Sequence, residues 1–531
     1  MSGHAEHAGA NGGGLAPEFD VRALLEADSE RREPHWAKVV DQTRCIGCHA
    51  CTTACRSENE VPLSVTRTYV KSVDIGTFPR ARRAFQVTRC NQCEDAPCVA
   101  ACPTSAMYRR PDGIVDFDKE ACIGCKACIA ACPYDAIFIN PEDRSAEKCN
   151  FCAHRLDVGL EPACVVVCPV EAILVGDLGD PNSRVAQIVN REPVTVRRPE
   201  KGTRPKLFYR GAHQATLDPL AARRPEGGLF MWSEQYAGPG AVTGGRPEPH
   251  NTSAAAVLSY DVPHRRPWDW RVSLYTWTKG IAAGAYLVLL ALALAGSLDW
   301  RDDLWRWAAP LLGGVFLALT GTVLIWDLEH PRRFPYIFTR SQWRSWLVRG
   351  AYVIAAYSIV LAAHLAASLA GLQAPQRWLA VAGAPLAAVT AVYTGYLFAQ
   401  AKARDLWQDP LLVPHLLVQA ALAGAAAALP AAAALGSPTE QLEWILVAAA
   451  LAHLLMVAAQ ASTAHATAHA ALASHELTRG RYALWFWAGA ALVAVAAAAP
   501  WLGVAAAPLA LAGLLAHEHA YVQAGQAVPL A

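Results

Sequence analysis

The stretch CIGCKACIAACP, residues 122–133, places four cysteines in the pattern C-x2-C-x2-C-x3-C and ends on proline. Three thiolates spaced in this way on a tight loop can bind three irons of one cubane cluster, and the fourth, one helical turn further on, points to a neighbouring cluster. Gly124 lies inside the loop, where the backbone must approach sulfur closely. The pattern predicts an iron–sulfur domain, which moves electrons one at a time.

Similar groups of four cysteines occur four times and use every cysteine of the chain. The groups are Cys45, Cys48, Cys51 and Cys55; Cys90, Cys93, Cys98 and Cys102; Cys122, Cys125, Cys128 and Cys132; and Cys149, Cys152, Cys164 and Cys168. They predict four 4Fe–4S clusters in two ferredoxin-like units. Structural zinc is the alternative, but zinc sites do not need the C-x2-C-x2-C-x3-C-P run. No apolar signal stretch opens the sequence, which argues against a secreted disulfide scaffold.

The second half of the sequence has the composition of a membrane domain. Of the 46 basic and 45 acidic residues, only 24 fall between Leu274 and Ala531, and no cysteine does. A soluble domain followed by a membrane domain segregates charge in this way, whereas a purely soluble protein does not. The formal net charge of +1 gives no electrostatic reason to expect a nucleic-acid partner.

Eight apolar runs in this half have lengths suited to spanning roughly 30 Å of hydrocarbon. They are residues 274–296, 307–326, 347–370, 378–400, 411–435, 442–463, 482–499 and 502–521. Many of their residues are alanine, which allows helix backbones to pack closely in lipid. The expected fold class is therefore an α+β double ferredoxin-like iron–sulfur domain followed by an all-α membrane domain of about eight transmembrane helices.

The chain divides into four expected parts. Residues 1–35 are expected to be disordered, and residues 36–180 to form the ferredoxin-like domain with four clusters. Residues 181–271 are rich in Pro, Gly and Arg and are expected to be an irregular linker or extension. Residues 272–531 are expected to form the transmembrane domain.

The basic residues predict the orientation in the membrane. With eight spans, twelve Lys and Arg residues lie on the side shared with the cluster domain, against Arg301, Arg306 and Arg377 on the other side. The positive-inside rule then places the cluster domain in the cytoplasm, at the inner (cytoplasmic) membrane of the cell. Two alternatives stay open: some arginines dock the cluster domain, or a partner's export signal carries the domain outward.

Residues 41–175 resemble the four-cluster iron–sulfur subunit of the molybdopterin oxidoreductase superfamily, of the dimethyl sulfoxide, polysulfide and tetrathionate reductase type. The resemblance rests on residues 90–104 and 122–134. It implies that the first cysteine group pairs with the fourth and the second with the third. The implied ligand sets are Cys45, Cys48, Cys51 and Cys168; Cys55, Cys149, Cys152 and Cys164; Cys90, Cys93, Cys98 and Cys132; and Cys102, Cys122, Cys125 and Cys128.

The membrane half resembles the NrfD/polysulfide-reductase membrane-subunit family. The match rests on WDLEHPRRF at residues 326–334, YTGY at residues 393–396 and WQDP at residues 407–410. It implies a quinone site, for menaquinone or ubiquinone, near the cluster-domain side and without haem. A haem would require paired histidines at matched depth on facing helices, and we expect none.

Eight residues are candidates for the quinone site, because ionisable and hydrogen-bonding groups within membrane spans are costly and usually functional. They are Tyr275, Thr276, Lys279, Asp327, His330, Arg332, Tyr393 and Tyr396. Two structural alternatives apply. Lys279 could snorkel along its own stem to the membrane surface, and residues 327–333 could form a salt-bridged turn. Polar residues near the last spans, including His517 and Glu518, are interpreted as surface polarity, with a proton path as the alternative.

These features predict an electron-transfer and membrane-anchor subunit that works between a separate molybdenum or tungsten bis-pterin subunit and membrane quinone. Nothing in the sequence could bind a pterin cofactor or carry out substrate chemistry, and the direction of electron flow is not encoded. The alternative is the cluster and quinone module of a hydrogenase or of another quinol-oxidising respiratory complex. A further alternative is an ion-translocating membrane protein driven by the clusters.

Overall fold

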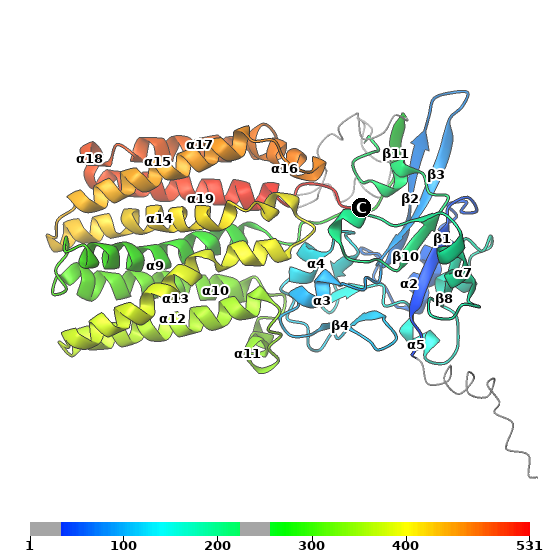
Figure 1. Cartoon of the computed structure of the whole chain (residues 1–531), viewed down its shortest axis with the longest axis horizontal. Helices are drawn as coiled ribbons and strands as arrows, with labels where there is room; N and C mark the ends of the chain where they lie inside the picture. The colour runs from blue at the N-terminus through cyan, green and yellow to red at the C-terminus, as the bar shows by residue number, and fades with distance from the viewer. Residues whose placement is uncertain (1–32, 224–254) are drawn as a thin grey trace, which may run out of the picture.

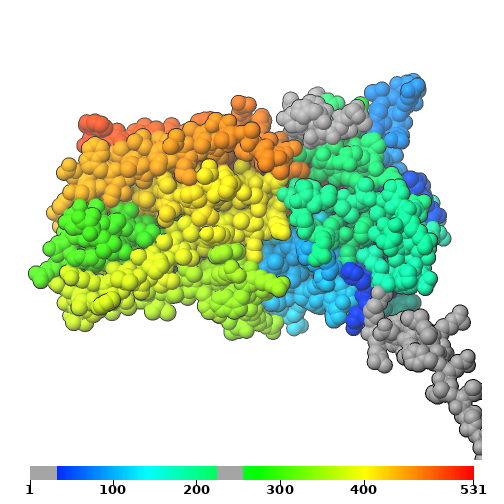
Figure 2. All heavy atoms as spheres, viewed as in Figure 1, coloured from blue at the N-terminus to red at the C-terminus, as the bar shows by residue number. Residues whose placement is uncertain are grey.

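The computed structural model describes residues 33–223 and 255–531 of the chain. These residues form a domain of short strands and helices that meets a bundle of long helices end to end (Figure 1). The space-filling view shows the two parts in contact across the width of the molecule (Figure 2). The predicted fold class is confirmed. Of the segment 1–35, only residues 33–35 lie within the described residues.

The first domain contains a four-stranded sheet. Its strands, in spatial order, are β8 (Ile173–Asp177), β1 (Trp36–Asp41), β10 (Leu207–Arg210) and β9 (Val194–Thr195). Strand β1 pairs antiparallel with β8 and parallel with β10. Val39 and Val40 of β1 are fully buried. The sheet therefore joins the segment that precedes the first cysteine group to the segments that follow the last one.

The described residues of this domain also form a second sheet and two hairpins. The sheet has the order β11 (Ala256–Tyr260), β2 (Thr68–Ile75) and β3 (Arg82–Arg89). The hairpins are β4 (Met107–Arg109) with β5 (Val115–Phe117), and β6 (Ile137–Ile139) with β7 (Ala146–Lys148). Each hairpin follows a cysteine loop and a short helix, so the two units repeat the same local arrangement.

Short helices carry or follow the cysteines. They are α2 (Ala50–Glu58), α3 (Pro97–Ala101), α4 (Ala127–Ala131), α5 (Ala153–Leu156) and α6 (Ala163–Val166). Cys98 lies in α3 and Cys128 in α4, while Cys102 and Cys132 cap the ends of these helices. The fourth cysteine of each of these groups thus lies one helical turn beyond the third, as the spacing predicts.

The prediction of an irregular segment over residues 181–271 is wrong for much of its described part. This segment contributes β9, β10 and β11, with α7 (Arg184–Arg191) and α8 (Gln214–Leu217). Leu207 and Tyr209 of β10 are buried in the domain core, and the Tyr209 hydroxyl donates to the Val87 carbonyl over 3.1 Å. The Pro-, Gly- and Arg-rich turns dominate the composition and conceal this short alternating strand. Residues 224–254 lie outside the described residues.

Within residues 33–223 and 255–531, seven helices are long and apolar enough to cross a membrane, and an eighth, shorter helix is also apolar. The seven are Trp270–Leu294 (α9), Leu304–Trp326 (α10 with its π-helical first turn), Trp346–Leu369 (α12), Gln373–Gln400 (α13), Leu412–Leu435 (α14), Glu440–Ser462 (α15) and Ala499–Ala524, which contains α18 (Ala499–Leu502) and α19 (Ala506–Ala524); the eighth is α17 (Ala483–Ala496). Two short helices, α11 (Tyr336–Thr339) and α16 (Ala468–Thr478), lie between them in the sequence. The protein is a multi-pass membrane protein.

Small residues bring the helices of the bundle close together. A Cβ atom on Gly284 of α9 would lie 1.7 Å from the Ala420 carbonyl oxygen of α14, and one on Gly424 would lie 2.1 Å from the Gly284 backbone. Any larger side chain would force α9 and α14 apart. The alanine- and glycine-rich composition therefore sets the helix spacing in this bundle.

Candidate functional site

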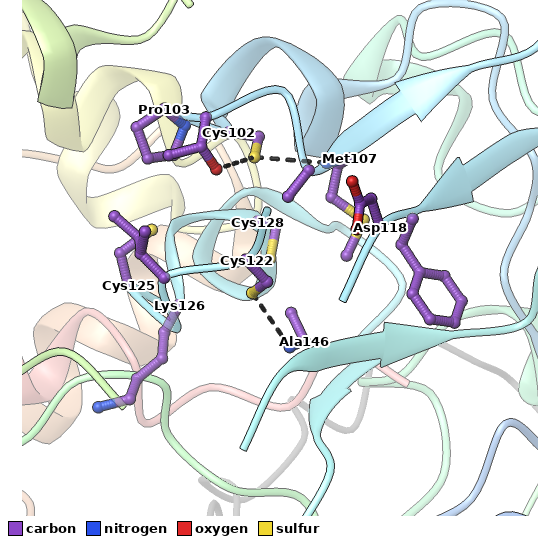
Figure 3. A pocket seen from close by; sticks show the side chains of 13 residues that line it. Cys102, Pro103, Met107, Asp118, Cys122, Cys125, Lys126, Cys128 and Ala146 are labelled. Atoms are coloured by element: carbon purple, nitrogen blue, oxygen red, sulfur yellow. Dashed lines mark hydrogen bonds between the residues drawn. The ribbon is translucent and has the colours of Figure 1, made fainter. Parts of the chain in front are cut away.

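A cavity in the first domain gathers one set of cysteines. Its lining includes Cys102, Cys122, Cys125 and Cys128 (Figure 3). Met107 N donates to Cys102 Sγ, and Ala146 N donates to Cys122 Sγ, each over 3.4 Å. Such donors favour the thiolate form of cysteine. The cavity brings together the four residues that the sequence resemblance assigns to one cluster.

A second cavity gathers another set. Its lining includes Cys55, Cys149, Cys152 and Cys164. Arg89 Nη1 donates to Cys164 Sγ over 2.9 Å, and Lys38 Nζ lies 3.8 Å from the same sulfur. Burial opposes ionisation of this thiol, but the charges of Arg89 and Lys38 outweigh it and lower the pKa of Cys164 to about 7. These four residues also form one of the implied sets.

The remaining eight cysteines lie near one another in a way that fits the other two implied sets. Burial raises the pKa of Cys98, and the nearby thiols of Cys90 and Cys132 raise it further. Burial also raises the pKa of Cys45, to which Cys168 and Cys48 contribute. All sixteen cysteines lie within the described ranges, and none of them forms a disulfide. Thiols arranged in fours, with N–H groups and cations directed at sulfur, fit 4Fe–4S clusters.

The loop of the first cavity binds directly to the membrane domain. Lys126, which follows Cys125, donates to the Asp327 carbonyl oxygen over 3.1 Å and lies 3.4 Å from Asp327 Oδ1. Its Nζ also lies 3.1 Å from Glu329 Oε1. Burial raises the pKa of the Asp327 carboxyl to about 6, although Lys126 counteracts the effect. Asp327, at the end of α10, therefore belongs to the contact between the two domains.

Backbone groups of the cysteine loop take part in the same contact. Arg333 Nη1 donates to the Cys122 carbonyl over 2.9 Å. The His330 backbone N–H donates to the Ile123 carbonyl over 3.2 Å. Both acceptors lie in the loop that lines the first cavity, so His330 is also part of the contact between the two domains.

Close backbone packing completes this contact. A Cβ atom on Gly124 would lie 2.4 Å from Glu329 Cβ, so only glycine permits this approach. Residues 327–333 thus form a turn that docks against the cysteine loop. This agrees largely with the salt-bridged turn that the sequence analysis gave as the structural alternative for these residues. Arg332 is exposed on its surface.

An aromatic stack adjoins this contact on the membrane side. Trp268 Nε1 donates to the Cys125 carbonyl over 3.1 Å. The Trp268 ring stacks on Phe398 and Trp407, with centroids 6.0 and 5.6 Å away. The same apolar core contains Ala127 of α4 and Tyr275 of α9. One apolar core therefore spans this end of the bundle and helix α4 of the first domain.

Residues 525–531, which follow α19, also lie in this contact. Leu530 and Ala531 are buried. Arg197 Nη2 donates to the Leu530 carbonyl over 2.9 Å, and Lys71 Nζ donates to the Ala531 backbone oxygen over 3.2 Å. The last membrane helix is thus tied by hydrogen bonds to the domain that carries the cysteines.

Lys279 lies inside the bundle and does not snorkel to the membrane surface. Its side chain is 1% exposed. The Nζ atom donates to the Ala391 carbonyl over 2.7 Å and to Thr394 Oγ1 over 2.9 Å, and it lies 4.9 Å from the centre of the Tyr393 ring. Tyr275, one turn earlier on α9, is also buried. The structure therefore brings three of the predicted residues together.

A fourth predicted residue contacts Glu518, which the sequence analysis interpreted as surface polarity, with a proton path as the alternative. Thr276 Oγ1 donates to Glu518 Oε2 over 3.1 Å, across 242 positions of sequence. Glu518 is 5% exposed, so its interpretation as surface polarity is wrong. Its only signal in the sequence is an acidic residue within an apolar span. We call Tyr275, Thr276, Lys279, Tyr393, Thr394 and Glu518 the buried polar group.

Tyr396 lies away from the buried polar group. Its ring is 40% exposed and stacks on Trp346 at 4.4 Å between centroids. Tyr393, three residues earlier, is buried beside Lys279. The two tyrosines of the YTGY motif therefore have different surroundings, and only Tyr393 shares the interior with Lys279.

The sequence matches two families of known proteins. Residues 82–178 match a family described as a 4Fe-4S dicluster domain. Residues 259–529, just over half of the chain, match the family described as polysulphide reductase, NrfD. This protein belongs to the NrfD family. Its first domain and its membrane domain thus correspond to the two resemblances inferred from the sequence.

Relatives of this NrfD-family protein match about a third to two fifths of its length. A subunit of tetrathionate reductase from Salmonella typhimurium is 39% identical over 233 residues, which cover 42% of this chain and 90% of that protein. One of the chains of polysulfide reductase from Wolinella succinogenes is 44% identical over 176 residues, which cover 33% of this chain and 92% of that protein. The arsenate respiratory reductase iron–sulfur subunit of a Shewanella strain is 36% identical over 219 residues, which cover 32% of this chain and 94% of that protein.

The family matches and the structure agree on the organisation of the protein. An iron–sulfur domain of the reductase-subunit type and an NrfD membrane domain are joined in one polypeptide. The predicted fusion is therefore confirmed. The protein is an electron-transfer membrane subunit with 4Fe–4S clusters as its cofactors.

Proposed function

We propose that this chain is the electron-transfer and membrane-anchor subunit of a quinone-linked molybdenum or tungsten oxidoreductase complex. Electrons would pass between a separate catalytic subunit and membrane quinone through four 4Fe–4S clusters. The observation that carries the proposal is the contact of the loop around Cys125 with the membrane domain, at the end where α9 enters the bundle. This loop adjoins the helix that carries Lys279.

The four cysteine sets described above would each hold one cluster. When bound, 4Fe–4S clusters accept and release single electrons. The protein supplies sixteen thiolate ligands and the groups that stabilise their negative charge. Among these groups are the Met107 and Ala146 amides and the Arg89 guanidinium. Hydrogen bonds and charges of this kind tune the reduction potential of each cluster.

The buried polar group would bind the quinone, which is menaquinone or ubiquinone. A quinone requires hydrogen-bond donors at its two oxygens and a route for two protons. Lys279 and Tyr275 provide donors, and Glu518 with Thr276 provides a carboxyl–hydroxyl pair for proton transfer. Lys279 is nine residues inside α9, which is about 14 Å along the helix axis from Trp270. Ionisable groups at this depth are costly and are retained for function.

The other quinone candidates have different surroundings. Asp327 and His330 bind the cysteine loop, whereas Arg332 and Tyr396 are exposed. We therefore retain Tyr275, Thr276, Lys279 and Tyr393 in the proposed quinone site and assign residues 327–333 to domain docking.

The relatives support a separate catalytic partner, because their names describe subunits of tetrathionate, polysulfide and arsenate reductases. We propose a molybdopterin-type partner that docks on the first domain. The excess of Lys and Arg on the cluster-domain side supports a cytoplasmic location for that domain. The membrane domain would anchor the complex in the inner membrane and contact lipid and the quinone pool.

Purification in mild detergent from the native membrane, followed by mass spectrometry of the co-purifying proteins and metal analysis, tests this function. We expect a large pterin-binding partner, molybdenum or tungsten, and about sixteen irons per chain. A partner with nickel or with several haems would instead support the hydrogenase or alternative quinol-oxidising complex. Zinc in place of iron at the cysteines, in protein isolated without air, would refute the electron-transfer role.

A further inference from the structure

Three histidines from three helices meet inside the membrane domain. His415 of α14, His453 of α15 and His517 of α19 are all buried, with exposed fractions of 6%, 0% and 1%. Each offers a ring nitrogen, and these nitrogens all lie within 4.8 Å of one another. The ring centroids are 4.8–5.4 Å apart. We call these residues the histidine trio.

Hydrogen bonds within the described residues leave part of the trio unsatisfied. His415 Nε2 and His453 Nδ1 lie 3.0 Å apart and share one hydrogen bond. His453 Nε2 and His517 Nδ1 are buried and have no hydrogen-bond partner among the described residues. Buried polar atoms are normally paired, because an unpaired one loses its hydration without compensation. The trio therefore has ring nitrogens whose hydrogen-bonding capacity the described residues do not use.

The spacing of the nitrogens suits a bound cation. Imidazole nitrogen binds Zn²⁺ at about 2.0–2.1 Å, which puts two ligand atoms of a tetrahedral site about 3.3 Å apart. The His415–His453 pair is already near that separation, at 3.0 Å. The ring nitrogen of His517 lies within 4.8 Å of those of His415 and His453. A small movement of the His517 side chain would therefore bring it to the same metal ion. Neutral imidazole is the form that binds metals.

The same spacing does not suit haem. A porphyrin between two histidines would have to separate their rings, whereas His415 and His453 share a direct hydrogen bond. His453 and His517 are also in edge contact, with centroids 4.8 Å apart. A single small ion fits this arrangement, and a macrocycle does not.

We propose that His415, His453 and His517 form a binding site for one first-row transition-metal cation, with Zn²⁺ as the probe, inside the membrane domain. An all-imidazole ligand set favours zinc, copper, nickel or iron over magnesium and calcium. Three protein ligands leave a fourth position for water or another small ligand. The ion would link α14, α15 and α19, and it would fix the helix on which Glu518 follows His517.

The test uses the full chain with its clusters loaded, purified without a histidine tag and washed with a chelator. Zinc is measured by mass spectrometry after addition of one equivalent of Zn²⁺ and removal of the excess. The variant H415Q/H453Q/H517Q removes the trio. The control H364Q removes a histidine of α12 that is also buried, with ring nitrogens unpartnered among the described residues, but is not part of the trio. Iron content and the elution volume check that each variant folds.

We expect one zinc per chain in the wild type and in H364Q, and loss of that zinc in the triple variant. X-ray absorption at the zinc edge should show only nitrogen or oxygen neighbours at about 2.0–2.1 Å in the wild type. This spectrum tests the site even if the triple variant fails to fold. Equal zinc in wild type and triple variant, sulfur neighbours at about 2.3 Å, or no retained zinc would overturn the proposal. The result does not depend on quinone or on the catalytic partner.

Discussion

Lys126 Nζ lies 3.4 Å from Asp327 Oδ1 and donates to the Asp327 carbonyl, so the residue after Cys125 binds the end of the second membrane helix. Both side chains are about nine-tenths buried, at 11% and 9% exposed. One cysteine set is therefore fixed directly against the membrane domain. The proposed route from cluster to quinone begins at this contact.

Removal of either partner should weaken this contact. Truncating one member of a largely buried ion pair costs about 3–5 kcal/mol when the other charge is left unpaired. Here the loss should be smaller, because Glu329 lies 3.1 Å from Lys126 and Arg271 lies 3.8 Å from Asp327. We expect K126A and D327A each to lower the free energy of unfolding, and the double variant to cost less than the sum. Chemical denaturation in detergent measures these values. Strictly additive losses would show that the two residues do not interact.

Loss of one cysteine ligand should remove one cluster. We expect C125A to lose about four irons per chain and, because its loop contacts the membrane domain, to lose electron exchange with quinone. The matched variant C48A changes an exposed cysteine of another set. It should lose a similar amount of iron but keep electron exchange between quinone and the remaining clusters. Iron analysis and electron paramagnetic resonance measure both effects. Equal loss of exchange in both variants would contradict the proposal that the cluster at Cys125 is the one that exchanges electrons with quinone.

The buried polar group should control quinone chemistry and not cluster assembly. We expect K279M and E518Q to reduce the rate of quinol-dependent cluster reduction by about 100-fold or more, the usual contribution of a positioned proton-transfer group. The control T278A changes a buried residue that hydrogen-bonds Thr320 at 2.8 Å and lies outside this group. It should behave like the wild type. Normal rates in K279M and E518Q would place the quinone elsewhere.

His264 should make the stability of the first domain depend on pH. Burial lowers the pKa of His264, but Asp261 and Asp135, at 3.2 and 2.5 Å, outweigh burial and raise it to about 10. A raised histidine pKa gives stability that is complete below pH 6.5 and is lost as pH rises through about 10. We expect the wild type to lose about 2.5 kcal/mol relative to H264Q between about pH 7 and pH 9. Parallel curves for the two proteins would contradict this ion pair.

The sequence predicts features that local patterns determine. Cysteine spacing predicted the loops and short helices that carry Cys98 and Cys128, and apolar length predicted the membrane helices. Contacts between distant segments were beyond such patterns. Glu518 meets Thr276 across 242 positions, and no local signal distinguishes that carboxyl from one at a helix end.

The same limit explains the histidine trio and the segment 181–271. His415, His453 and His517 come from three helices, so their approach depends on how the bundle packs. The strand β10 is four residues long and lies among Pro- and Gly-rich turns, so the composition of the segment does not predict it. Its pairing with the distant strand β1 stabilises it. Tertiary pairing, rather than local propensity, determines both features.

Electron exchange between the clusters and quinone is tested most directly by reduction of the clusters by quinol, in the purified, cluster-loaded protein reconstituted in lipid vesicles without air. Menaquinol or ubiquinol is added, and reduced clusters are followed by electron paramagnetic resonance. We expect quinol to reduce clusters in the wild type. K279M should slow this reaction by about 100-fold or more and C125A should abolish it, while dithionite still reduces the clusters that remain. Clusters that dithionite reduces but that exchange no electrons with either quinone couple, in either direction, would contradict electron exchange between the clusters and quinone.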